Sequence, residues 1–542
     1  MSLYDKMGLL ITPNGVAPSK IFAYKPTNGS GDGVFDRNTT ATRVNSSGLI
    51  EDVAIDMARI DYPTNGSCPH LLFEPQSTNL ITQSESFGKS YWTKTGASIQ
   101  GDPSTAGVEE VVNGDFATDT WWGKDTSWTI SGGSANSNGS GTMYKGSVLT
   151  IGKTYLVSFD ISSYTSGSVS YPNGGFTPTL AVGSYSFTYM ASSATVSFSG
   201  VSFIGSIDNV SVKEVQGFES PSLDSPTGAF KLVEDTINSS HQLISLFSFT
   251  SGVSYTFSVF VKKLGSRDSI KIQAGNPATW GAESVFDLSN GTVSSTINGS
   301  AEIDGLYNGY YKCTVTGVAN VTAGTAIVLR LYNGGTTYTG DGTSGVYIYG
   351  AQLEALPYAT SYIPTSGSAV TRVKDVATNF GDVNSFNSSE GVLFVEMAAL
   401  SNDTSFRAMS INDGYTTNRI TLVYNGGIRV FNVSGGSVSS NLDYVTTITN
   451  TQKIAIVWSS SFFDLWVNGV KRGSGSGVSF SSGTLNTMGF EQGNGGNNMY
   501  AKVKQVQVYK EALTDAELIT LTASSTYTEL AQVNSYNLIL DI

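Results

Sequence analysis

The sequence predicts a multidomain, all-β protein: two jelly-roll β-sandwiches, one inserted in the other, followed by a third β-sandwich and preceded by a small β-rich segment. Composition is the first observation behind this prediction. Of the 542 residues 60 are Gly and only 13% are charged, while Ser, Thr, Asn, Tyr, Val and Ile dominate the short segments between turn signals. Length is the second, because a single core stops growing at about 250–300 residues. The third is a sequence formula that occurs twice.

The repeated formula indicates where one sandwich enters the other. Residues 80–98 run from Leu-Ile-Thr-Gln-Ser-Glu-Ser-Phe to Ser-Tyr-Trp-Thr-Lys-Thr-Gly-Ala-Ser, and residues 111–134 run from Val-Val-Asn-Gly-Asp-Phe to Thr-Ser-Trp-Thr-Ile-Ser-Gly-Gly-Ser. The first copy breaks off near Thr105. Its continuation, from Ser225, appears only after the second copy has closed at residues 205–214. A complete module therefore interrupts another one.

We name the two modules the host sandwich, residues 85–107 and 217–365, and the guest sandwich, residues 108–216. Chain ends of such modules often lie close together, so we expect the guest sandwich to be attached by two adjacent linkers. Trp92 and Trp128 hold the same place in the two copies of the formula, so both are expected to pack in the two cores.

The remaining segments flank this pair. Residues 1–84, the leader, alternate short strands with polar turns, and residues 366–523, the C-terminal sandwich, contain strands such as Gly391-Val-Leu-Phe-Val-Glu-Met. Asn468-Gly469 suits a type I′ turn between two of those strands. The only stretch with an apolar helical period is Glu511 to Leu521, with Thr514 as cap and Glu517 three residues later.

A C-terminal tail, residues 524–542, ends in the apolar run Leu538-Ile-Leu-Asp-Ile. Two interpretations of this tail stay open. It adds a strand to a neighbouring subunit, or it folds back on its own domain.

Several of these segments resemble structural proteins of tailed bacteriophages. In the leader the resemblance rests on the order and spacing of Phe35-Asp-Arg-Asn-Thr-Thr-Ala-Thr-Arg-Val-Asn, Gly48-Leu-Ile-Glu, Arg59-Ile-Asp-Tyr and Leu71-Leu-Phe-Glu-Pro-Gln-Ser-Thr-Asn-Leu. The host sandwich ends in Gly350-Ala-Gln-Leu-Glu-Ala-Leu-Pro-Tyr, which is similar to phage virion proteins that carry carbohydrate-binding-like jelly rolls.

The other two sandwiches resemble carbohydrate-binding families. The guest sandwich begins with Asn113-Gly-Asp-Phe and ends with Ile207-Asp-Asn-Val-Ser-Val, as jelly-roll carbohydrate-binding modules do. The C-terminal sandwich, with its Leu465-Trp-Val-Asn-Gly hairpin and its Val508-Tyr-Lys-Glu-Ala-Leu-Thr-Asp-Ala-Glu-Leu segment, resembles the concanavalin A-like lectin/glucanase (LamG) domain.

These resemblances imply a virion surface protein, such as a tail or head fibre, spike, adhesin or decoration component, that attaches to the host. The partners they imply are other virion proteins and the glycans of a cell surface or mucosa. They also imply a homotrimer, assembled in the cytoplasm of the host bacterium, with the leader as the anchor to the particle. The sequence has no heptad run that would itself indicate trimerisation.

Charge and patterning exclude other classes of protein. The formal net charge is −13 and the basic residues do not cluster, which argues against a nucleic-acid partner. No window approaches about 18 apolar residues and no signal-like segment opens the chain, so we expect neither membrane insertion nor Sec export. Cys68 and Cys313 fall in different modules and are expected to be two buried free thiols of a protein that folds in a reducing cytoplasm.

No catalytic constellation is evident, so the chain is predicted not to be an enzyme. Glucanases of the concanavalin A-like fold commonly carry Glu-x-Asp-x-x-Glu, and the nearest string, from Glu302, has Tyr307 at the third acid and lies in the host sandwich. His70 and His241 have no nucleophile elbow near them and are expected to be surface or half-buried residues. The acids scattered through the C-terminal sandwich include Glu396, Asp403, Asp413, Asp443, Asp464 and Glu491.

Two alternatives to a non-enzymatic adhesin stay open. Carboxylates from separate strands of the C-terminal sandwich would make the chain a polysaccharide depolymerase. Sandwiches that hold virion subunits together and bind no sugar would make it a structural scaffold.

Aromatic residues in loop-like surroundings are the candidates for sugar binding, because a ring stacks on the apolar face of a pyranose. Packing in a core is the alternative for each of these residues. By contrast, Trp458 and Trp466 alternate with apolar residues on strands and are expected in the core. The candidates are Trp121, Trp122, Tyr171 and Trp280.

Calcium is the one cofactor that the sequence leaves open, since jelly-roll modules often hold a structural ion with carboxylate and carbonyl oxygens. Asp208 lies where such modules often place a ligand, and Asp115 is a second candidate. The alternative is that Asp208 caps a turn or accepts a hydrogen bond from a backbone amide. No phosphate loop and no zinc motif is found in the sequence.

Overall fold

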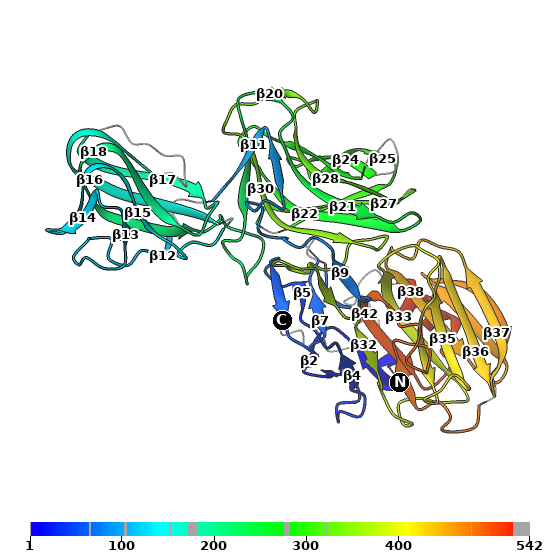
Figure 1. Ribbon diagram of the computed structural model, residues 1–542. Helices are drawn as coiled ribbons and strands as arrows, with labels where there is room; N and C mark the ends of the chain where they lie inside the picture. Colours follow the sequence, from blue (N-terminus) through cyan, green and yellow to red (C-terminus); the bar gives the residue numbers. More distant parts are fainter. Residues whose placement is uncertain are drawn as a thin grey trace. The chain divides into compact units, whose positions relative to one another are not determined.

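The computed structural model describes residues 2–63, 67–101, 106–151, 153–171, 181–275, 282–306, 308–320, 322–478 and 480–523. The chain divides into two compact units (Figure 1). The first comprises Met1–Thr78, Thr360–Ile363 and Thr371–Ile542, and the second comprises Asn79–Ala359 and Pro364–Val370. Strands dominate both units, which confirms the predicted fold class.

In the first unit the C-terminal sandwich consists of two facing sheets. One sheet has the strand order β37-β36-β35-β34-β41, and the other has the order β40-β39-β38-β33-β42-β8-β7, with β1 also paired to β42. Their strands are β1 (Met7–Ile11), β7 (Arg59–Asp61), β8 (His70–Leu72), β33 (Gly391–Ala399), β34 (Arg407–Asn412), β35 (Arg419–Tyr424), β36 (Ile428–Ser434), β37 (Ser437–Tyr444), β38 (Gln452–Trp458), β39 (Phe462–Val467), β40 (Val470–Ser476), β41 (Thr487–Gly489) and β42 (Ala501–Tyr509).

The leader is built into this sandwich. β1 pairs antiparallel with the C-terminal half of β42, from Ile11 opposite Val506 to Met7 opposite Tyr509. β8 pairs with the other half, with Leu72 opposite Lys502. Without these strands β42 would be an exposed sheet edge, which proteins usually protect. The leader, expected to be a separate anchoring segment, therefore belongs to the same compact unit as the C-terminal sandwich.

Small sheets complete the leader. A four-strand order, β2-β3-β4-β32, joins it to the segment before the C-terminal sandwich, and β5 pairs with β6. The bounds are β2 (Val16–Ala17), β3 (Lys20–Ile21), β4 (Gly33–Asp36), β5 (Ala41–Val44), β6 (Ile50–Val53), β9 (Ser77–Asn79), β31 (Val370–Arg372) and β32 (Val376–Thr378).

A buried ionic cluster ties the leader to residues 360–375. Arg59 pairs with Glu74 at 2.5 Å and also with Asp375, and Arg372 contacts Glu74 at 2.7 Å. Arg37 lies 3.3 Å from the other oxygen of Asp375. The guanidinium groups hold the pKa of Glu74 well below its usual range in spite of its burial. Breaking such a buried network leaves an uncompensated charge, so the cluster fixes how the leader packs.

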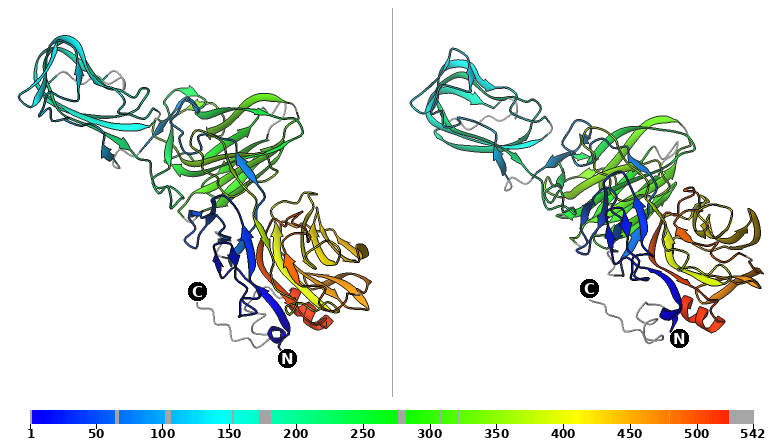
Figure 2. Two further views of the ribbon diagram at one scale, coloured as in Figure 1. Left: turned by 60° about the horizontal axis from the view of Figure 1, so that its bottom comes forward. Right: turned by 90° about the horizontal axis from the view of Figure 1, so that it is seen from below.

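Helices are few and short. α2 (Asp515–Ala523) begins where the sequence predicts it. Glu517 N donates to Thr514 Oγ1 at 3.3 Å, and Thr514 N donates to Glu517 Oε2 at 2.9 Å. α1 (Leu3–Lys6), which was not predicted, is a single turn. It lies beside α2, with Lys6 Nζ 2.8 Å from Glu517 (Figure 2). No helix in the described part of the chain is long and apolar enough to cross a membrane.

In the second unit the host sandwich has two sheets around one core, with the orders β10-β21-β28-β23-β24-β25 and β11-β19-β30-β22-β27-β26. The bounds are β10 (Thr93–Thr95), β11 (Ala97–Gln100), β19 (Phe230–Glu234), β20 (Asn238–Ser239), β21 (Gln242–Phe249), β22 (Ser254–Leu264), β23 (Ser269–Ala274), β24 (Ala282–Asp287), β25 (Thr292–Ile297), β26 (Ser300–Gly305), β27 (Tyr311–Val318), β28 (Ala323–Tyr332), β29 (Tyr338–Thr339) and β30 (Gly345–Glu354).

The guest sandwich is inserted between two paired strands of the host. β11 ends at Gln100, which lies opposite Lys231 of β19, and the guest's own first and last strands pair as well, with Ala106 opposite Val215. The chain therefore enters and leaves the guest sandwich at neighbouring positions, as expected for two adjacent linkers. The strands are β12 (Ala106–Glu109), β13 (Gly123–Lys124), β14 (Trp128–Ser131), β15 (Ser134–Lys145), β16 (Thr154–Ser170), β17 (Gly183–Met190) and β18 (Val196–Val215).

The guest differs from a plain two-sheet sandwich. Its strands form one continuous sheet, in the order β13-β15-β18-β16-β17, which curves around a single core. Irregular register between β16 and β18, for example between Ser158 and Asp160, bends these long strands, so that each of them serves both sides of the core. The sequence could not show this, because two separate sheets and one bent sheet have the same alternation.

Tryptophans and the predicted turn follow the sequence prediction. Trp92 and Trp128 are buried in the host and guest cores, and each indole N–H donates to a backbone carbonyl, of Gln83 at 2.9 Å and of Gly141 at 3.1 Å. Trp458 and Trp466 are buried in the C-terminal sandwich. Asn468 and Gly469 both have positive φ, as a type I′ turn requires.

Three polar residues differ from expectation. Both cysteines are free, but only Cys313 is buried, and burial raises its pKa, whereas Cys68 is exposed. His70 is buried, and burial, with Lys502 and Lys504 nearby, lowers its pKa to about 3. His241 is also buried, with its ring nitrogens 2.5 Å from the carbonyl oxygen of Gly96 and 3.1 Å from that of Tyr338. The predicted tail lies outside the described residues.

Candidate functional site

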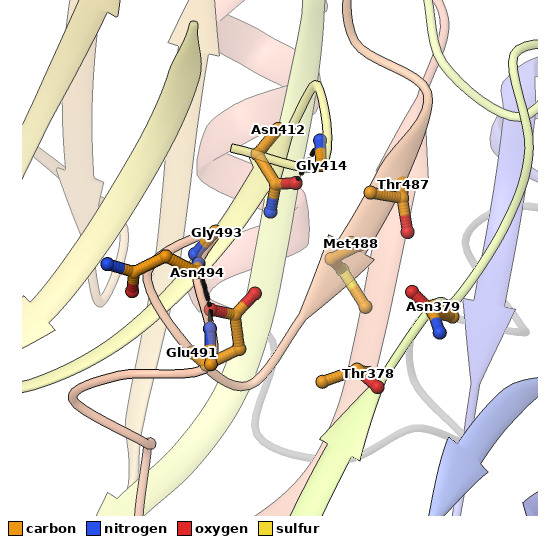
Figure 3. A pocket seen from close by; sticks show the side chains of 10 residues that line it. Thr378, Asn379, Asn412, Gly414, Thr487, Met488, Glu491, Gly493 and Asn494 are labelled. Carbon is orange, nitrogen blue, oxygen red and sulfur yellow. Dashed lines mark hydrogen bonds between the residues drawn. The ribbon is translucent and has the colours of Figure 1, made fainter. Parts of the chain in front are cut away.

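A pocket of about 180 Å³ opens at one end of the C-terminal sandwich, where β34, β41 and β32 end. Figure 3 shows the loop that follows β41 on one side of this pocket and the β32 and β41 residues on the other. The lining residues are Thr378, Asn379, Asn412, Gly414, Thr487, Met488, Glu491, Gly493, Asn494 and Gly495.

Glu491 organises the loop. Its Oε2 accepts hydrogen bonds from the backbone N–H groups of Gly493 at 2.5 Å, Asn494 at 2.7 Å and Gly495 at 2.7 Å. Successive amides of this kind form a concave anion site, which here is filled by the protein's own carboxylate. Gly493 and Gly495 have positive φ, so the loop needs glycine there.

A second loop, residues 412–418, meets the first. Asn412 is buried at the end of β34, where its Oδ1 accepts from Gly414 N at 2.8 Å and its Nδ2 donates to Ser410 Oγ at 2.9 Å. A side-chain Cβ at Gly493 would lie 2.4 Å from the carbonyl oxygen of Tyr415, so the two loops are in close backbone contact only because residue 493 is glycine. Tyr415 thereby lies in a loop whose backbone contacts the pocket wall, and its side chain, which is 71% exposed, is not one of those that line the pocket.

The opposite wall offers groups for a ligand. Thr378 and Asn379 line this wall, whereas Thr487 Oγ1, which has no hydrogen-bond partner among the residues that the structure describes, is enclosed by protein atoms. Asn379 is exposed and has a φ of +58°, and Met488 supplies an apolar surface. A half-open pocket with several amide and hydroxyl groups and an apolar wall, next to a loop that carries an exposed ring, has the kinds of group that sugar recognition uses.

Carboxylates of the C-terminal sandwich are held by partners of their own. Glu491 is fixed by its three amides, and Asp413 accepts from Tyr415 N at 3.0 Å and from Asn418 Nδ2 at 2.8 Å. The others contact Arg or Lys side chains, at 2.9 Å for Asp403, 2.6 Å for Asp443, 2.6 Å for Asp464 and 3.8 Å for Glu396.

Two predicted sugar-binding residues are core residues of the guest sandwich. Trp122 is buried against Phe116, and its indole N–H donates to Asn113 O at 3.1 Å. Tyr171 is fully buried, and its hydroxyl lies 2.8 Å from that of Tyr189. Burial raises the pKa of Tyr171. The prediction that Trp122 and Tyr171 lie at the surface is therefore wrong. A strand or turn pattern alone does not tell which side of a curved sheet a ring occupies. Trp280 lies outside the described residues.

Trp121 differs from these residues. It is partly exposed and has a φ of +73°, which is strained for a bulky residue and is more frequent at functional sites. Asn113 holds the preceding loop by donating to Thr118 O at 2.8 Å and Thr120 O at 3.0 Å. The Trp121 ring meets Trp122 edge-on at 4.7 Å, and Lys145 Nζ lies 5.6 Å above it. Trp121 thus stays a candidate, although its ring is partly covered.

The two predicted calcium ligands lie near each other but point to local partners. Val210 N donates to Gly114 O at 2.8 Å, which brings their segments together. Asp115 is exposed and accepts from Ala117 N at 3.3 Å, whereas Asp208 accepts from Asn209 N at 2.7 Å, as the alternative interpretation expected. In the described ranges no three His, Cys, Asp or Glu side chains gather as an ion site would require. Calcium stays a prediction.

Sequence reasoning missed the pocket of the C-terminal sandwich. Tyr415 and Glu491 stand in loops that meet only in the folded chain, and neither loop has an apolar or catalytic motif. The one local signal is Glu491-Gln-Gly-Asn-Gly-Gly, in which a carboxylate precedes a glycine-rich run able to curl around it.

Comparison with known families agrees with this architecture. Residues 383–519 match a family model described as the concanavalin A-like lectin/glucanases superfamily. This part of the chain is therefore a concanavalin A-like domain, and the pocket beside Tyr415 lies within it, with Thr378 and Asn379 just outside the matched range. A search of curated protein sequences gives no match to the chain.

Solved structures match smaller parts. A carbohydrate-binding module (CBM40) of the Ruminococcus gnavus IT-sialidase bound to α2,3 sialyllactose is 18% identical, over 25% of this chain and 83% of that one, with a TM-score of 0.22. Domain 4 of a GH43 extracellular arabinanase from Geobacillus stearothermophilus, in complex with arabinotriose, is 13% identical over 30% and 81%, with a TM-score of 0.24. Similarity this low does not carry the ligands of those proteins over to this chain.

Proposed function

We propose that this chain is a non-enzymatic surface protein of a bacteriophage virion whose C-terminal sandwich binds a glycan in the pocket beside Tyr415. The observation that carries the binding proposal is a pocket lined by amide, hydroxyl and apolar side chains, next to the loop that carries Tyr415, whose side chain is 71% exposed. A pyranose presents both complementary surfaces, an apolar C–H face and a rim of hydroxyl groups.

The arrangement suits binding more than hydrolysis. A glycosidase needs two carboxyl groups free to face one glycosidic bond. Glu491, the acid that lines the pocket, instead accepts three backbone hydrogen bonds with a single oxygen, which fixes the loop. The loop is thus a rigid part of the pocket wall, as a preorganised binding site requires.

The virion assignment is supported by the sequence resemblance of the leader, together with the host and guest sandwiches that precede the concanavalin A-like domain. A homotrimer would present several copies of one weak pocket to a surface rich in repeated glycans. Linked sites of this kind gain avidity without any new contact. Mass measurement in solution tests the oligomeric state.

A glycan array tests the binding proposal. We expect the full-length chain to bind a limited set of glycans, and Tyr415→Ala to weaken that binding at least about tenfold, equivalent to 1.4 kcal/mol. Tyr24→Ala is the matched control, because Tyr24 is also an exposed tyrosine, at 47%, but lies in the leader away from the pocket. Equal loss in the two variants, or binding by Tyr415→Ala as strong as by the parent chain, would contradict the assignment.

A further inference from the structure

One sheet of the host sandwich presents an unusual outer face. Alternation along β23 and β28 directs one set of side chains into the host core and the other set outward. The core set comprises Ile270, Ile272, Leu329 and Leu331. Lys271, Gln273, Val328 and Arg330 therefore share the outer face of the sheet. Within this set, Lys271 lies directly opposite Arg330 in the register of the two strands.

Two cations at directly opposed positions destabilise a sheet unless something compensates them. Lys271 is compensated, because its Nζ lies 2.5 Å from Glu283 Oε1 on the next strand. Arg330 forms no ion pair with a carboxylate of the described residues: its Nε donates to Gln242 Oε1 at 2.9 Å, and the carboxylate whose charge acts on it, Glu283, is already paired with Lys271. Burial lowers the pKa of Arg330, so this guanidinium is also poorly solvated.

The remaining acid of this face is occupied elsewhere. Asp287, on the same side of β24 as Glu283, accepts from Ser289 N at 2.8 Å and from Asn290 Nδ2 at 2.8 Å within its own turn. These donors lower the pKa of Asp287. The guanidinium of Arg330 thus keeps donors for an outside acceptor.

Apolar side chains surround the cation. Val328 is 4% exposed and Val285 is 9% exposed, although the alternation of the strands places both on the outer face. Tyr332, two residues after Arg330, is partly exposed on the same side of β28. A partly exposed arginine and a partly exposed ring on one strand face offer a charged group and a flat apolar surface, which complement the carboxylate and the C–H face of an acidic sugar.

We propose that this outer face, defined by Gln242, Lys271, Val328, Arg330 and Tyr332, binds a carboxylate-bearing polysaccharide, with the guanidinium of Arg330 paired to a carboxylate of the sugar. Guanidinium and carboxylate match as planar, bidentate partners. The chain as a whole carries a formal charge of −13, so it repels polyanions unless a local cation such as Arg330 holds them. The site belongs to the host sandwich and does not depend on the pocket beside Tyr415.

The test compares three polymers and four proteins by affinity electrophoresis of the full-length chain. The polymers are polygalacturonate, neutral dextran and dextran sulfate. The proteins are the parent chain, Arg330→Gln, Arg330→Lys and Tyr415→Ala, each checked for an unchanged melting temperature. Arg330→Gln removes the charge but keeps donors for Gln242, and Arg330→Lys keeps the charge without the planar fork.

We expect polygalacturonate to retard the parent chain and Tyr415→Ala equally, and increasing salt to weaken the retardation. Arg330→Gln should reduce the affinity at least about tenfold, with Arg330→Lys in between. Retardation of Arg330→Gln as strong as that of the parent would overturn the proposal. So would no retardation of the parent chain by polygalacturonate, or retardation by dextran sulfate or dextran alone. Loss of binding in Tyr415→Ala only would place the acidic sugar in the C-terminal pocket and equally overturn it.

Discussion

The guest sandwich and the C-terminal sandwich differ in which part of the chain supplies the strands that complete their sheets. The guest closes with strands of one continuous segment, since β12 and β18, at its two ends, pair with each other. The C-terminal sandwich takes β1, β7 and β8 from the leader, which is separated from it in the sequence by the whole of the host and guest sandwiches. The first is therefore a self-contained insertion. The second is a composite of two distant segments, so a boundary placed by sequence alone would cut through its core.

The hydrophobic cores of the two sandwiches differ in the same way. Leader side chains pack between the two sheets of the C-terminal sandwich, in one cluster with residues such as Leu393 and Val508. The leader residues of that cluster are Leu9, Ile11, Ile21, Phe35, Ala58, Leu71 and Phe73. The guest core consists of guest residues alone.

Deletion of the leader is expected to have the largest effect on stability, and to affect the two sandwiches differently. We expect a chain that lacks residues 2–78 to lose the fold of the C-terminal sandwich, because β42 becomes an open edge and the core loses its leader side chains. Residues 106–216 expressed alone should fold and melt cooperatively. Circular dichroism and calorimetry compare the two. A cooperative C-terminal melting transition without the leader would contradict the composite core.

The same reasoning changes how the anchor is tested. A truncation of residues 1–84 that abolishes incorporation into particles would not separate a lost anchor from an unfolded C-terminal sandwich. Substitutions on the exposed part of the leader, such as Tyr24→Ala, leave the core intact and test attachment more cleanly.

A smaller difference in stability is expected when the buried ionic cluster is disrupted. Arg59→Ala leaves Glu74 and Asp375 without their shared partner and should destabilise the first unit by about 3–5 kcal/mol. The comparison in the guest is Lys153→Ala, which removes the exposed Lys153–Glu214 pair at 2.7 Å and should cost less than about 1 kcal/mol. Urea unfolding measures both. Similar effects at the two sites would refute the special role of the cluster.

Acid should also change the stability of the first unit and of the guest sandwich to different extents. His70 has a folded pKa of about 3 against an unfolded value near 6.5, so the unfolded chain binds more protons between these values and stability falls as the pH decreases. Over pH 6.5 to 4.5 we expect a loss of about 2–3 kcal/mol from the first unit. The guest contains no histidine, so its stability should change little in that window.

His70→Leu is the control for this effect. Stability curves of the parent chain and of the variant should converge as the pH falls from 6.5 to 4.5. A parallel pH dependence in the variant would assign the effect to another group. Asp61, whose Oδ2 lies 3.4 Å from His70 Nε2 and whose pKa is raised by burial, would then be examined first.

How far the sequence predicts this molecule depends on the distance over which each feature is encoded. Local signals were sufficient for the Thr514–Glu517 cap of α2, for the Asn468-Gly469 turn, and for the paired core positions of Trp92 and Trp128. A repeated formula and a capping box are complete within a few residues. The fold class follows from such local patterns added together.

Features that join distant segments escaped prediction. Nothing in Met7–Ile11 indicates that this strand pairs with residues 506–509, because any apolar edge strand would fit the pattern. The pocket has the same cause, since Tyr415 and Gly493 meet through tertiary packing. Trp122 and Tyr171 were misplaced because the guest sheet curves, and alternation does not show which face the curve encloses.

A crystal structure of the full-length chain soaked with the strongest glycan from the array tests the central claim most directly. The account predicts sugar density against the exposed ring of Tyr415, with hydroxyl groups of the sugar within hydrogen-bond distance of polar side chains that line the pocket, such as Asn379 and Asn494. Density for the glycan at another site, with this pocket empty at a saturating concentration, would contradict it.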